Sequence, residues 1–152
     1  MYPIMLDLKD KTIVIIGGGR IALRKTKALL QAGGRVVVVA PMHDEEFESL
    51  ENVALIKRPY RTGDCKEAHL IFACTDSKVI NQQIVEEAEP WQWVNDCSKK
   101  ENSDFFNMSI IQHETGVVAF SSNGQSPVET KKLKQEIEAL LCEKELLHNK
   151  IE

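Results

Sequence analysis

The sequence contains no long apolar run. No stretch of its 152 residues approaches the ~18 consecutive apolar residues of a membrane-spanning helix. The opening MYPIMLDLKDK also has neither the basic start nor the extended apolar core of a secretory signal peptide. We therefore expect a cytoplasmic protein that does not contact a membrane.

Cysteine is scarce, and its spacing forms no recognisable pair. Cys65, Cys74, Cys97 and Cys142 include no C-x-x-C motif, which favours reduced, mostly buried thiols over zinc ligands or disulfides. The isolated histidines His69 and His113 are the only other candidates that we considered for a metal. Because they do not cluster with further ligands in the sequence, we expect no metal site.

Positive charge is not in excess. The sequence contains 19 Lys and Arg residues and 23 Asp and Glu residues, which gives a formal net charge of −4. This balance argues against sequence-independent binding to nucleic acid, which requires a basic surface against the phosphates. A polyanionic small molecule could still bind, but only through a local basic patch.

A glycine-rich turn follows the first strongly apolar segment. Residues 12–16, TIVII, lack polar alternation, as is typical of a strand buried on both faces of a parallel sheet. Gly17, Gly19 and Ala22 then fit the pattern G-x-G-x-x-A, which combines a tight turn, close backbone approach to a diphosphate and close helix packing. The pattern predicts a dinucleotide-binding turn; a turn required by packing alone is the alternative.

The predicted cofactor is NAD, with its diphosphate on the N–H groups at the start of the following helix, where the helix dipole favours an anion. The residues predicted to bind it in this turn are Gly17, Gly18, Gly19, Arg20, Ile21 and Ala22. The acidic ribose ligand expected about 20 residues further on is missing, because the next strand runs into Pro41, Met42 and His43. We expect backbone around Pro41 and Met42 to contact the adenosine, and the choice between NAD and NADP stays open.

Strand-like and helix-like segments alternate through the first two thirds of the chain. This order predicts an α/β fold, a Rossmann-like doubly wound parallel sheet with ligands at its carboxyl edge. The predicted strands are 12–16, 35–39, 53–56, 70–74 and 93–95, and the predicted helices are 21–31, 44–51 and 79–87.

Polar residues follow two of the later strands at the same predicted edge. Thr75 and Asp76 come after the strand 70–74, Asn81 lies in the helix beyond, and Asn95 ends the strand 93–95. We expect all four to contact the cofactor. Capping of the helix 79–87 by Asp76 with Asn81 is an equally good interpretation.

The last third has a different pattern. Two β-like runs, 105–113 and 116–121, predict a hairpin, and Ser126 followed by Pro127 and Glu129 predicts the start of a helix. That helix carries one apolar stripe, made of Leu133, Ile137, Leu140, Leu141 and Leu147. Since a hairpin with one helix buries little on its own, we expect two domains, residues 1–104 for NAD binding and 105–152 for dimerisation, and a homodimer.

Several segments taken in order resemble the precorrin-2 dehydrogenases of sirohaem synthesis, including the amino-terminal module of sirohaem synthases. The segments that carry the likeness are YPIMLDLKDK (2–11), GGGRIALRK (17–25), VVVVAP (36–41), ACTDSKVIN (73–81), the strand ending at Asn95, and AFSSNGQSP (119–127). The resemblance implies oxidation of precorrin-2, a tetrapyrrole, to sirohydrochlorin with NAD as hydride acceptor, in a dimer. Some members of the family also insert iron.

The resemblance also implies site residues. It suggests that the tetrapyrrole contacts Ser122, Asn123, Gly124 and Ser126. Lysines near the active edge could bind its carboxylates, although a solvated basic face is the alternative for each: Lys99, Lys100, Lys131, Lys132 and Lys134.

At the catalytic position, the sequence departs from the family pattern. A gap-free alignment through Asn95 and Phe105 places Ser98 where the family has an aspartate, and serine is a poor general base near neutral pH. Asp96 lies two residues before that position and Asp104 six residues after it. The catalytic candidates are therefore Asp96, Ser98 and Asp104, of which we favour Asp96, with Glu101 in reserve.

Two other functions fit the same residues. One is a non-enzymatic nucleotide-sensing domain resembling the regulatory modules of potassium channels, which normally carry the acidic residue missing after the second strand here. The other is a degenerate relative of the dehydrogenases that binds NAD and dimerises without turnover, an alternative suggested by Ser98.

Overall fold

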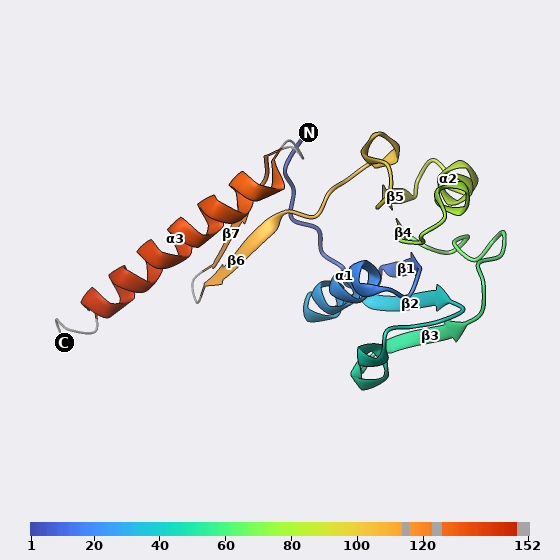
Figure 1. The fold of residues 1–152 in the computed structure, drawn as a ribbon, viewed down its shortest axis with the longest axis horizontal. Helices are drawn as coiled ribbons and strands as arrows, with labels where there is room; N and C mark the ends of the chain where they lie inside the picture. Colours follow the sequence, from blue (N-terminus) through green and yellow to red (C-terminus); the bar gives the residue numbers. More distant parts are fainter. Residues whose placement is uncertain (114–115, 123–125, 149–152) are drawn as a thin grey trace. The chain divides into compact units, whose positions relative to one another are not determined.

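Five parallel strands form the centre of the larger of two compact units (Figure 1). The computed structural model describes residues 1–113, 116–122 and 126–148. The strands stand in the order β3-β2-β1-β4-β5, which confirms the predicted doubly wound sheet. Their bounds are β1 Thr12–Ile16, β2 Arg35–Ala40, β3 Val53–Lys57, β4 Leu70–Ala73 and β5 Trp93–Asp96.

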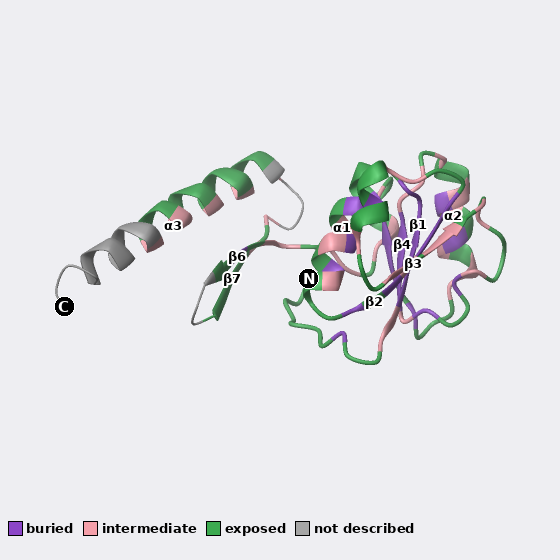
Figure 2. Cartoon of the chain, turned by 90° about the horizontal axis from the view of Figure 1, so that it is seen from below, coloured by how far each residue is buried: buried purple, intermediate pink, exposed green. Residues whose placement is uncertain are grey.

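Helices α1 (Arg20–Gln31) and α2 (Lys78–Glu87) cover opposite faces of this sheet (Figure 2). Successive residues of β1 serve the two faces in turn. Ile13 and Ile15 pack in the same core cluster as Leu23 of α1, whereas Val14 and Ile16 pack in the cluster of Ile84 of α2. Because both faces of the strand are buried, β1 has to be apolar throughout, which explains its lack of polar alternation.

Helix α1 ends at its predicted stop. The Gly33 amide donates to the Leu30 carbonyl at 3.0 Å and the Gly34 amide to the Leu29 carbonyl at 2.9 Å. This pair of bonds satisfies the last carbonyls of the helix in a Schellman motif, and the chain turns directly into β2.

The order of the strands creates a switch point beside β1. The chain moves from β1 outward to β2 and β3, then returns to the other side of β1 to form β4 and β5. In such sheets, ligands bind where the connections from neighbouring strands diverge, at the carboxyl ends. The glycine turn after β1 and Thr75 after β4 both lie at this point.

Two short 3₁₀ helices complete the α/β part, η1 at Glu45–Ser49 and η2 at Lys100–Asn102. The predicted acidic helix at 44–51 corresponds to η1. The Asp44 side chain caps it by accepting a hydrogen bond from the Glu46 amide at 3.2 Å.

The structure divides into two compact units, residues 4–106 and residues 107–152 together with 1–3. The second unit contains the antiparallel strands β6 (Ser109–His113) and β7 (Gly116–Phe120) and helix α3 (Pro127–His148). The expected hairpin turn, Glu114 and Thr115, lies outside the described residues. No helix in the described ranges is long and apolar enough to span a membrane.

The first hairpin strand begins four residues later than predicted. Phe105 belongs to the sheet unit instead, since its carbonyl accepts a hydrogen bond from Asn95 Nδ2 at 2.8 Å. Its ring also packs edge-on against Phe72 in β4, with ring centroids 5.2 Å apart. Helix α3 begins as predicted, with Ser126 Oγ accepting from the Glu129 amide at 3.2 Å and Pro127 as the first helical residue.

Candidate functional site

Two glycines let the ends of three strands close around the turn after β1. Gly17 has φ of +122°, and a Cβ there would lie 2.4 Å from the carbonyl oxygen of Cys74 after β4. A Cβ on Gly18 would lie 2.2 Å from the carbonyl oxygen of Met42 after β2. Neither distance is compatible with a side chain, so the fold itself requires both glycines.

Gly19 is different, because a Cβ built there has no atom within 4 Å. It is the N-terminal cap of α1, and among the described residues no side chain caps the first turn of that helix by a hydrogen bond. Open space in front of uncapped helical amides is the arrangement that binds a phosphate. The turn therefore fits the diphosphate of a dinucleotide.

A cavity of about 690 Å³ lies over this turn, within the usual size range of cofactor sites. Nine of the residues predicted to bind the cofactor line it: Gly17, Gly18, Gly19, Arg20, Ile21, Pro41, Met42, Thr75 and Asp76. Tyr60 and Cys74, which the motifs did not predict as site residues, also line it. Cys74 ends a predicted strand at the ligand edge, which was a usable signal; nothing in the loop around Tyr60 indicated its position.

Three other predicted cofactor residues do not line this cavity. Ala22, on the inner face of α1, is fully buried in the core. Asn81 is fully buried and holds Thr75: its Oδ1 accepts from Thr75 Oγ1 at 2.7 Å, and its Nδ2 donates to the Thr75 carbonyl at 3.1 Å. Asn81 thus holds Thr75, which lines the cavity, without lining the cavity itself.

The capping interpretation of Asp76 with Asn81 is wrong. Ser77 caps α2, with its Oγ accepting from the Ile80 amide at 3.3 Å. Asp76 is exposed at the cavity wall, and Asn81 faces back toward Thr75.

Asn95, the third of these residues, joins β5 to α1. It is buried, and its Oδ1 accepts from Lys25 Nζ at 2.9 Å. Burial lowers the pKa of Lys25 below its ordinary value, although nearby thiols oppose the shift. The ammonium group also lies 4.8 Å from the centre of the Phe72 ring. Lys25 is therefore an internal tie between the helix and the sheet.

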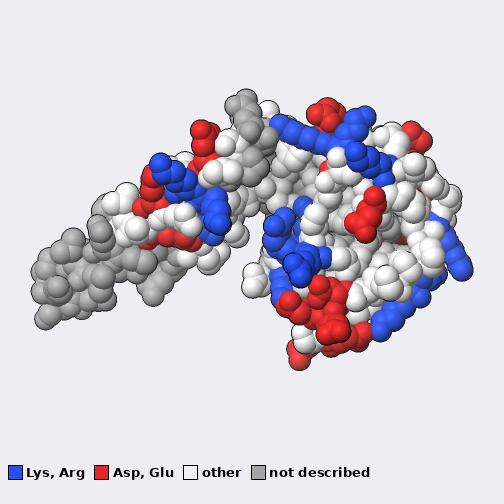
Figure 3. Space-filling model, in the orientation of Figure 1, with Lys and Arg blue, Asp and Glu red and all other residues white. Residues whose placement is uncertain are grey.

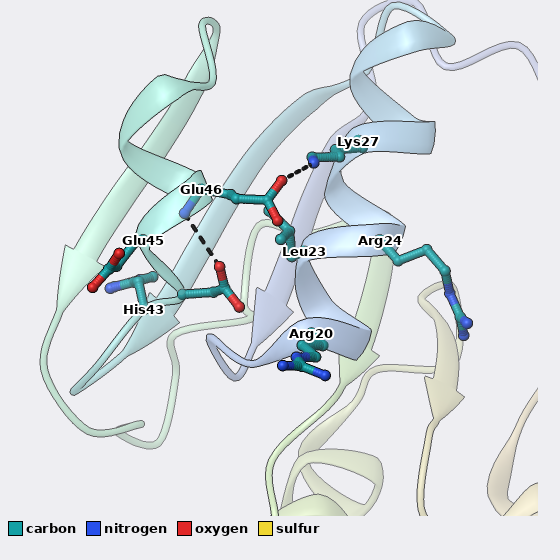
Figure 4. Close-up of a pocket in the computed structure, with 8 residues that line it drawn as sticks. Arg20, Leu23, Arg24, Lys27, His43, Glu45 and Glu46 are labelled. Carbon is teal, nitrogen blue, oxygen red and sulfur yellow. Dashed lines mark hydrogen bonds and ion pairs between the residues drawn. The ribbon is translucent and has the colours of Figure 1, made fainter.

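A second cavity of about 830 Å³ adjoins the first (Figure 4). Arg20, His43 and Asp44 line both cavities. In the second cavity, Lys27 of α1 pairs with Glu46 of η1, whereas the Arg24 side chain points away from Glu46. Figure 3 shows Lys and Arg side chains beside Asp and Glu side chains on the surface. Because this region, past the end of β2, carries both signs of charge, it does not decide between NAD and NADP.

His43 occupies the chain position after β2 where an acidic ribose ligand was expected. Neither of its ring nitrogens has a hydrogen-bond partner among the described residues, and both are buried. Its ring packs edge-on against Phe47 at 5.5 Å. From the sequence, His43 was expected only to follow the end of the strand.

Asp96 is the centre of a hydrogen-bonded loop. Its Oδ1 accepts from the Ser98 amide at 2.8 Å, Ser98 Oγ at 2.7 Å and the Lys99 amide at 3.2 Å, and its Oδ2 accepts from Asn102 Nδ2 at 3.1 Å. Burial acts to raise the pKa of this carboxyl, but the hydrogen bonds outweigh it and hold the pKa below its ordinary value. Asp96 is therefore ionised and fully engaged.

Asp104 continues the edge of the sheet. Its Oδ2 accepts from the Val94 amide at 2.8 Å, and its own amide donates to the Val94 carbonyl at 2.8 Å. Among the described residues that line the two cavities, none of the catalytic candidates Asp96, Ser98 and Asp104 is present.

The remaining predicted residues lie elsewhere. Ser122 Oγ accepts from the Ser126 amide at 3.0 Å, ahead of α3, while Asn123 and Gly124 lie outside the described residues. His69 Nδ1 accepts from the Thr12 amide at 3.1 Å and joins two strands; the side chain of His113 is not described. Within the described part of the chain, no group of three or more His, Cys, Asp and Glu side chains could hold a metal ion.

Comparisons with known proteins agree with this geometry. A family model described as putative NAD(P)-binding matches residues 4–109. A precorrin-2 dehydrogenase of Bacillus subtilis is 33% identical over 144 residues, which cover 93% of this chain and 89% of that protein. The solved structure of SirC, a precorrin-2 dehydrogenase, superposes with a TM-score of 0.82 and 27% identity, over 91% of this chain and 70% of that one.

Longer proteins also match. A siroheme synthase of Tolumonas auensis is 35% identical over 141 residues, which are 91% of this chain and 30% of that protein. One from Actinobacillus pleuropneumoniae is 35% identical over 143 residues, 91% of this chain and 29% of its own length. This chain therefore spans less than a third of these siroheme synthases.

Substitutions at Gly18 and Gly19 should have contrasting effects, the first on stability and the second on cofactor binding. Gly18→Ala should lower the free energy of unfolding by ~1–3 kcal/mol, because its Cβ would overlap the Met42 carbonyl. Gly19→Val should cost ~1 kcal/mol or less, because valine is a poorer N-cap than glycine, yet lose NAD binding, because its side chain would fill the space for the diphosphate. Urea unfolding and calorimetric titration with NAD check both. Equal NAD affinity in folded Gly19→Val would place the cofactor elsewhere.

The hydrogen bonds to Asp96 predict that the free energy of unfolding depends on pH. Since the pKa is lowered by folding, the carboxylate stabilises the fold above the ordinary value of ~3.9, and this contribution is lost as the pH falls through the lower folded value. Asp96→Asn should reduce stability at pH 7 by ~1–3 kcal/mol and weaken its acid dependence, as measured by urea unfolding at pH 7 and pH 3. Asp76→Asn, at an exposed site, is the control and should leave the stability nearly unchanged. If Asp96→Asn also has the stability of the wild type, the loop does not depend on this carboxylate.

Proposed function

The chain belongs to the precorrin-2 dehydrogenase family, and from this membership we propose that it oxidises precorrin-2 to sirohydrochlorin with NAD. The observation that carries the proposal is the open space at Gly19 before the uncapped start of α1, in a chain that covers 89% of a precorrin-2 dehydrogenase. We place the reaction in the cytoplasm, since the free thiols Cys65, Cys74 and Cys97 fit a reducing compartment.

The cofactor supplies a hydride acceptor when it is bound. The amides of Arg20 and Ile21 would hold its diphosphate, and the backbone at Pro41 and Met42 would face the adenosine. Thr75 and Asp76 would lie at the other wall, toward the end of β4. Asn81 fixes Thr75 through three hydrogen bonds, so this wall does not have to reorganise when the cofactor enters.

Loss of a hydride from the substrate also requires loss of a proton, and we assign its acceptor to the loop after β5. Asp96 is the candidate that we retain. Its carboxylate bonds to the hydroxyl of Ser98 at 2.7 Å, and Ser98 is exposed, so the hydroxyl lies between the carboxylate and solvent. The low pKa of Asp96 makes it a weak base, which suits the transfer of a proton from a cationic intermediate better than from a neutral carbon acid.

The substrate assignment rests on charge. Precorrin-2 carries many carboxylates, and Lys99 and Lys100, both exposed, lie in the same loop as Ser98. We assign Ser122, Asn123, Gly124 and Ser126, ahead of α3, as further substrate contacts.

The reaction is tested directly with the purified chain, enzymatically made precorrin-2 and NAD, without added metal. We expect NADH to form in step with the absorbance of sirohydrochlorin, and Gly19→Val to abolish both. Asp96→Asn should lower kcat by ~10²-fold or more at nearly unchanged NAD affinity, the size of a general acid–base contribution. NAD binding by calorimetry without any turnover would instead favour a sensor or a degenerate relative.

We also propose that the second unit forms a homodimer. Several apolar side chains of the hairpin and α3 are exposed in the single chain, namely Ile110, Val117, Val118, Val128, Leu133 and Leu140. Figure 2 shows the described part of α3 as largely exposed. The same unit of a second copy offers an equivalent surface to cover them, as in an isologous interface.

The dimer predicts a selective effect of charge. Leu133→Glu, on the apolar stripe, should yield a monomer at micromolar concentration, because it would bury a carboxylate in the interface. Gln135→Glu adds the same charge to the same helix away from that stripe and should leave the dimer intact. Sedimentation velocity measures both, and a monomeric wild-type chain would contradict the proposal.

A further inference from the structure

Two cysteines lie side by side at the carboxyl ends of β4 and β5. The strands pair in parallel with Ala73 opposite Asp96, and the Cys97 amide donates to the Ala73 carbonyl at 3.0 Å. The next residues, Cys74 and Cys97, therefore face each other across one strand spacing of about 4.8 Å. This spacing lies within the range of Cα separations that a disulfide bridges.

Their sulfur atoms are already in contact. Cys74 Sγ and Cys97 Sγ are 3.0 Å apart, so little movement separates this pair from the sulfur–sulfur bond length of about 2.05 Å. Cys65, the other thiol described, is buried alone, and burial raises its pKa to about 12. The three thiols that the structure describes are thus one isolated, buried thiol and one pair.

The surroundings of the pair distinguish its two members. The hydrogen bond with Cys74 lowers the pKa of Cys97, burial opposes this, and the charge of Lys25 lowers it further. Arg24 acts in the same direction as Lys25, and the neighbouring Asp96 opposes them. The same hydrogen bond, together with burial, raises the pKa of Cys74. Cys97 is therefore the more acidic thiol of the pair and Cys74 the less acidic one.

We propose that Cys74 and Cys97 are a redox-active dithiol that exchanges with low-molecular-weight disulfides. The Cys97 thiolate attacks one sulfur of the small disulfide and releases one small thiolate, which leaves a mixed disulfide on Cys97. Cys74 then loses its proton to solvent and attacks Cys97 Sγ, and the second small thiolate leaves. The protein pair is oxidised by two electrons, and the small disulfide is reduced to two thiols.

This assignment concerns the thiols alone, and neither NAD nor precorrin-2 takes part in the exchange. Its location nevertheless matters, because Cys74 lines the dinucleotide cavity and its carbonyl lies against the turn at Gly17. A reversible bond between β4 and β5 would form at the edge of the proposed cofactor site.

The test incubates the reduced full-length chain with oxidised glutathione, followed by alkylation, tryptic digestion and mass spectrometry. Trypsin cuts after Lys66, Lys78 and Lys99, so Cys74 and Cys97 fall in separate peptides, 67–78 and 79–99. We expect these two peptides to be recovered linked. Cys65→Ser is the matched control and should give the same result as the wild type.

Single variants test the order of the steps. Cys74→Ser should accumulate glutathione on Cys97, because the resolving thiol is missing, whereas Cys97→Ser should leave Cys74 largely unmodified. Lys25→Met should raise the midpoint pH of Cys97 alkylation by about one pH unit, as expected on removal of a nearby opposite charge. Recovery of peptides 67–78 and 79–99 only as unlinked, alkylated species would overturn the proposal, and so would glutathione on Cys65 at the same rate.

Discussion

The fold of the α/β part depends on one close approach of backbone to backbone. At the carboxyl edge, the carbonyls of Cys74 and Met42 occupy the space that side chains at Gly17 and Gly18 would fill. This contact brings the ends of β4 and β2 against the end of β1. The cavity, the start of α1 and the wall at Thr75 all take their positions from these contacts. Gly17 and Gly18 are therefore required by the fold, whereas Gly19 borders the open space proposed for the diphosphate.

A second layer of polar contacts holds this edge in place from inside. Asn81 fixes Thr75, and Asn95 joins Lys25 to the carbonyl of Phe105. Both asparagines are buried with their polar atoms bonded, which avoids the large cost of an unpaired buried amide. Residues that a sequence motif marks as cofactor ligands can therefore contribute by holding the residues that touch the cofactor.

The sheet could be predicted from the sequence because each of its signals is local. The uninterrupted apolar run of β1, the glycines after it and the stop at Gly33 each depend on residues within a few positions of one another. The role of Asn95 depends on its contact with Lys25, 70 residues away along the chain, and no spacing rule encodes this contact. Asn81 holds Thr75 only six residues away, but its full burial, which keeps it out of the cavity, depends on how α2 packs against the sheet. The predicted start of the hairpin at Phe105 was also wrong because of a distant contact, since Phe105 packs on Phe72 of β4.

Lys25 shows why such distant contacts matter for the site. A lysine inside a helix that packs on a sheet would normally be excluded, because burial of an uncompensated ammonium is expensive. Here the Asn95 carbonyl oxygen, the face of the Phe72 ring and the paired thiols at the ends of β4 and β5 surround it. The charge thereby links α1, whose first turn faces the nucleotide cavity, to β5, whose following loop contains Asp96 and Ser98. Any change in the charge of the thiol pair is consequently felt by the same lysine that joins the proposed cofactor helix to the proposed catalytic loop.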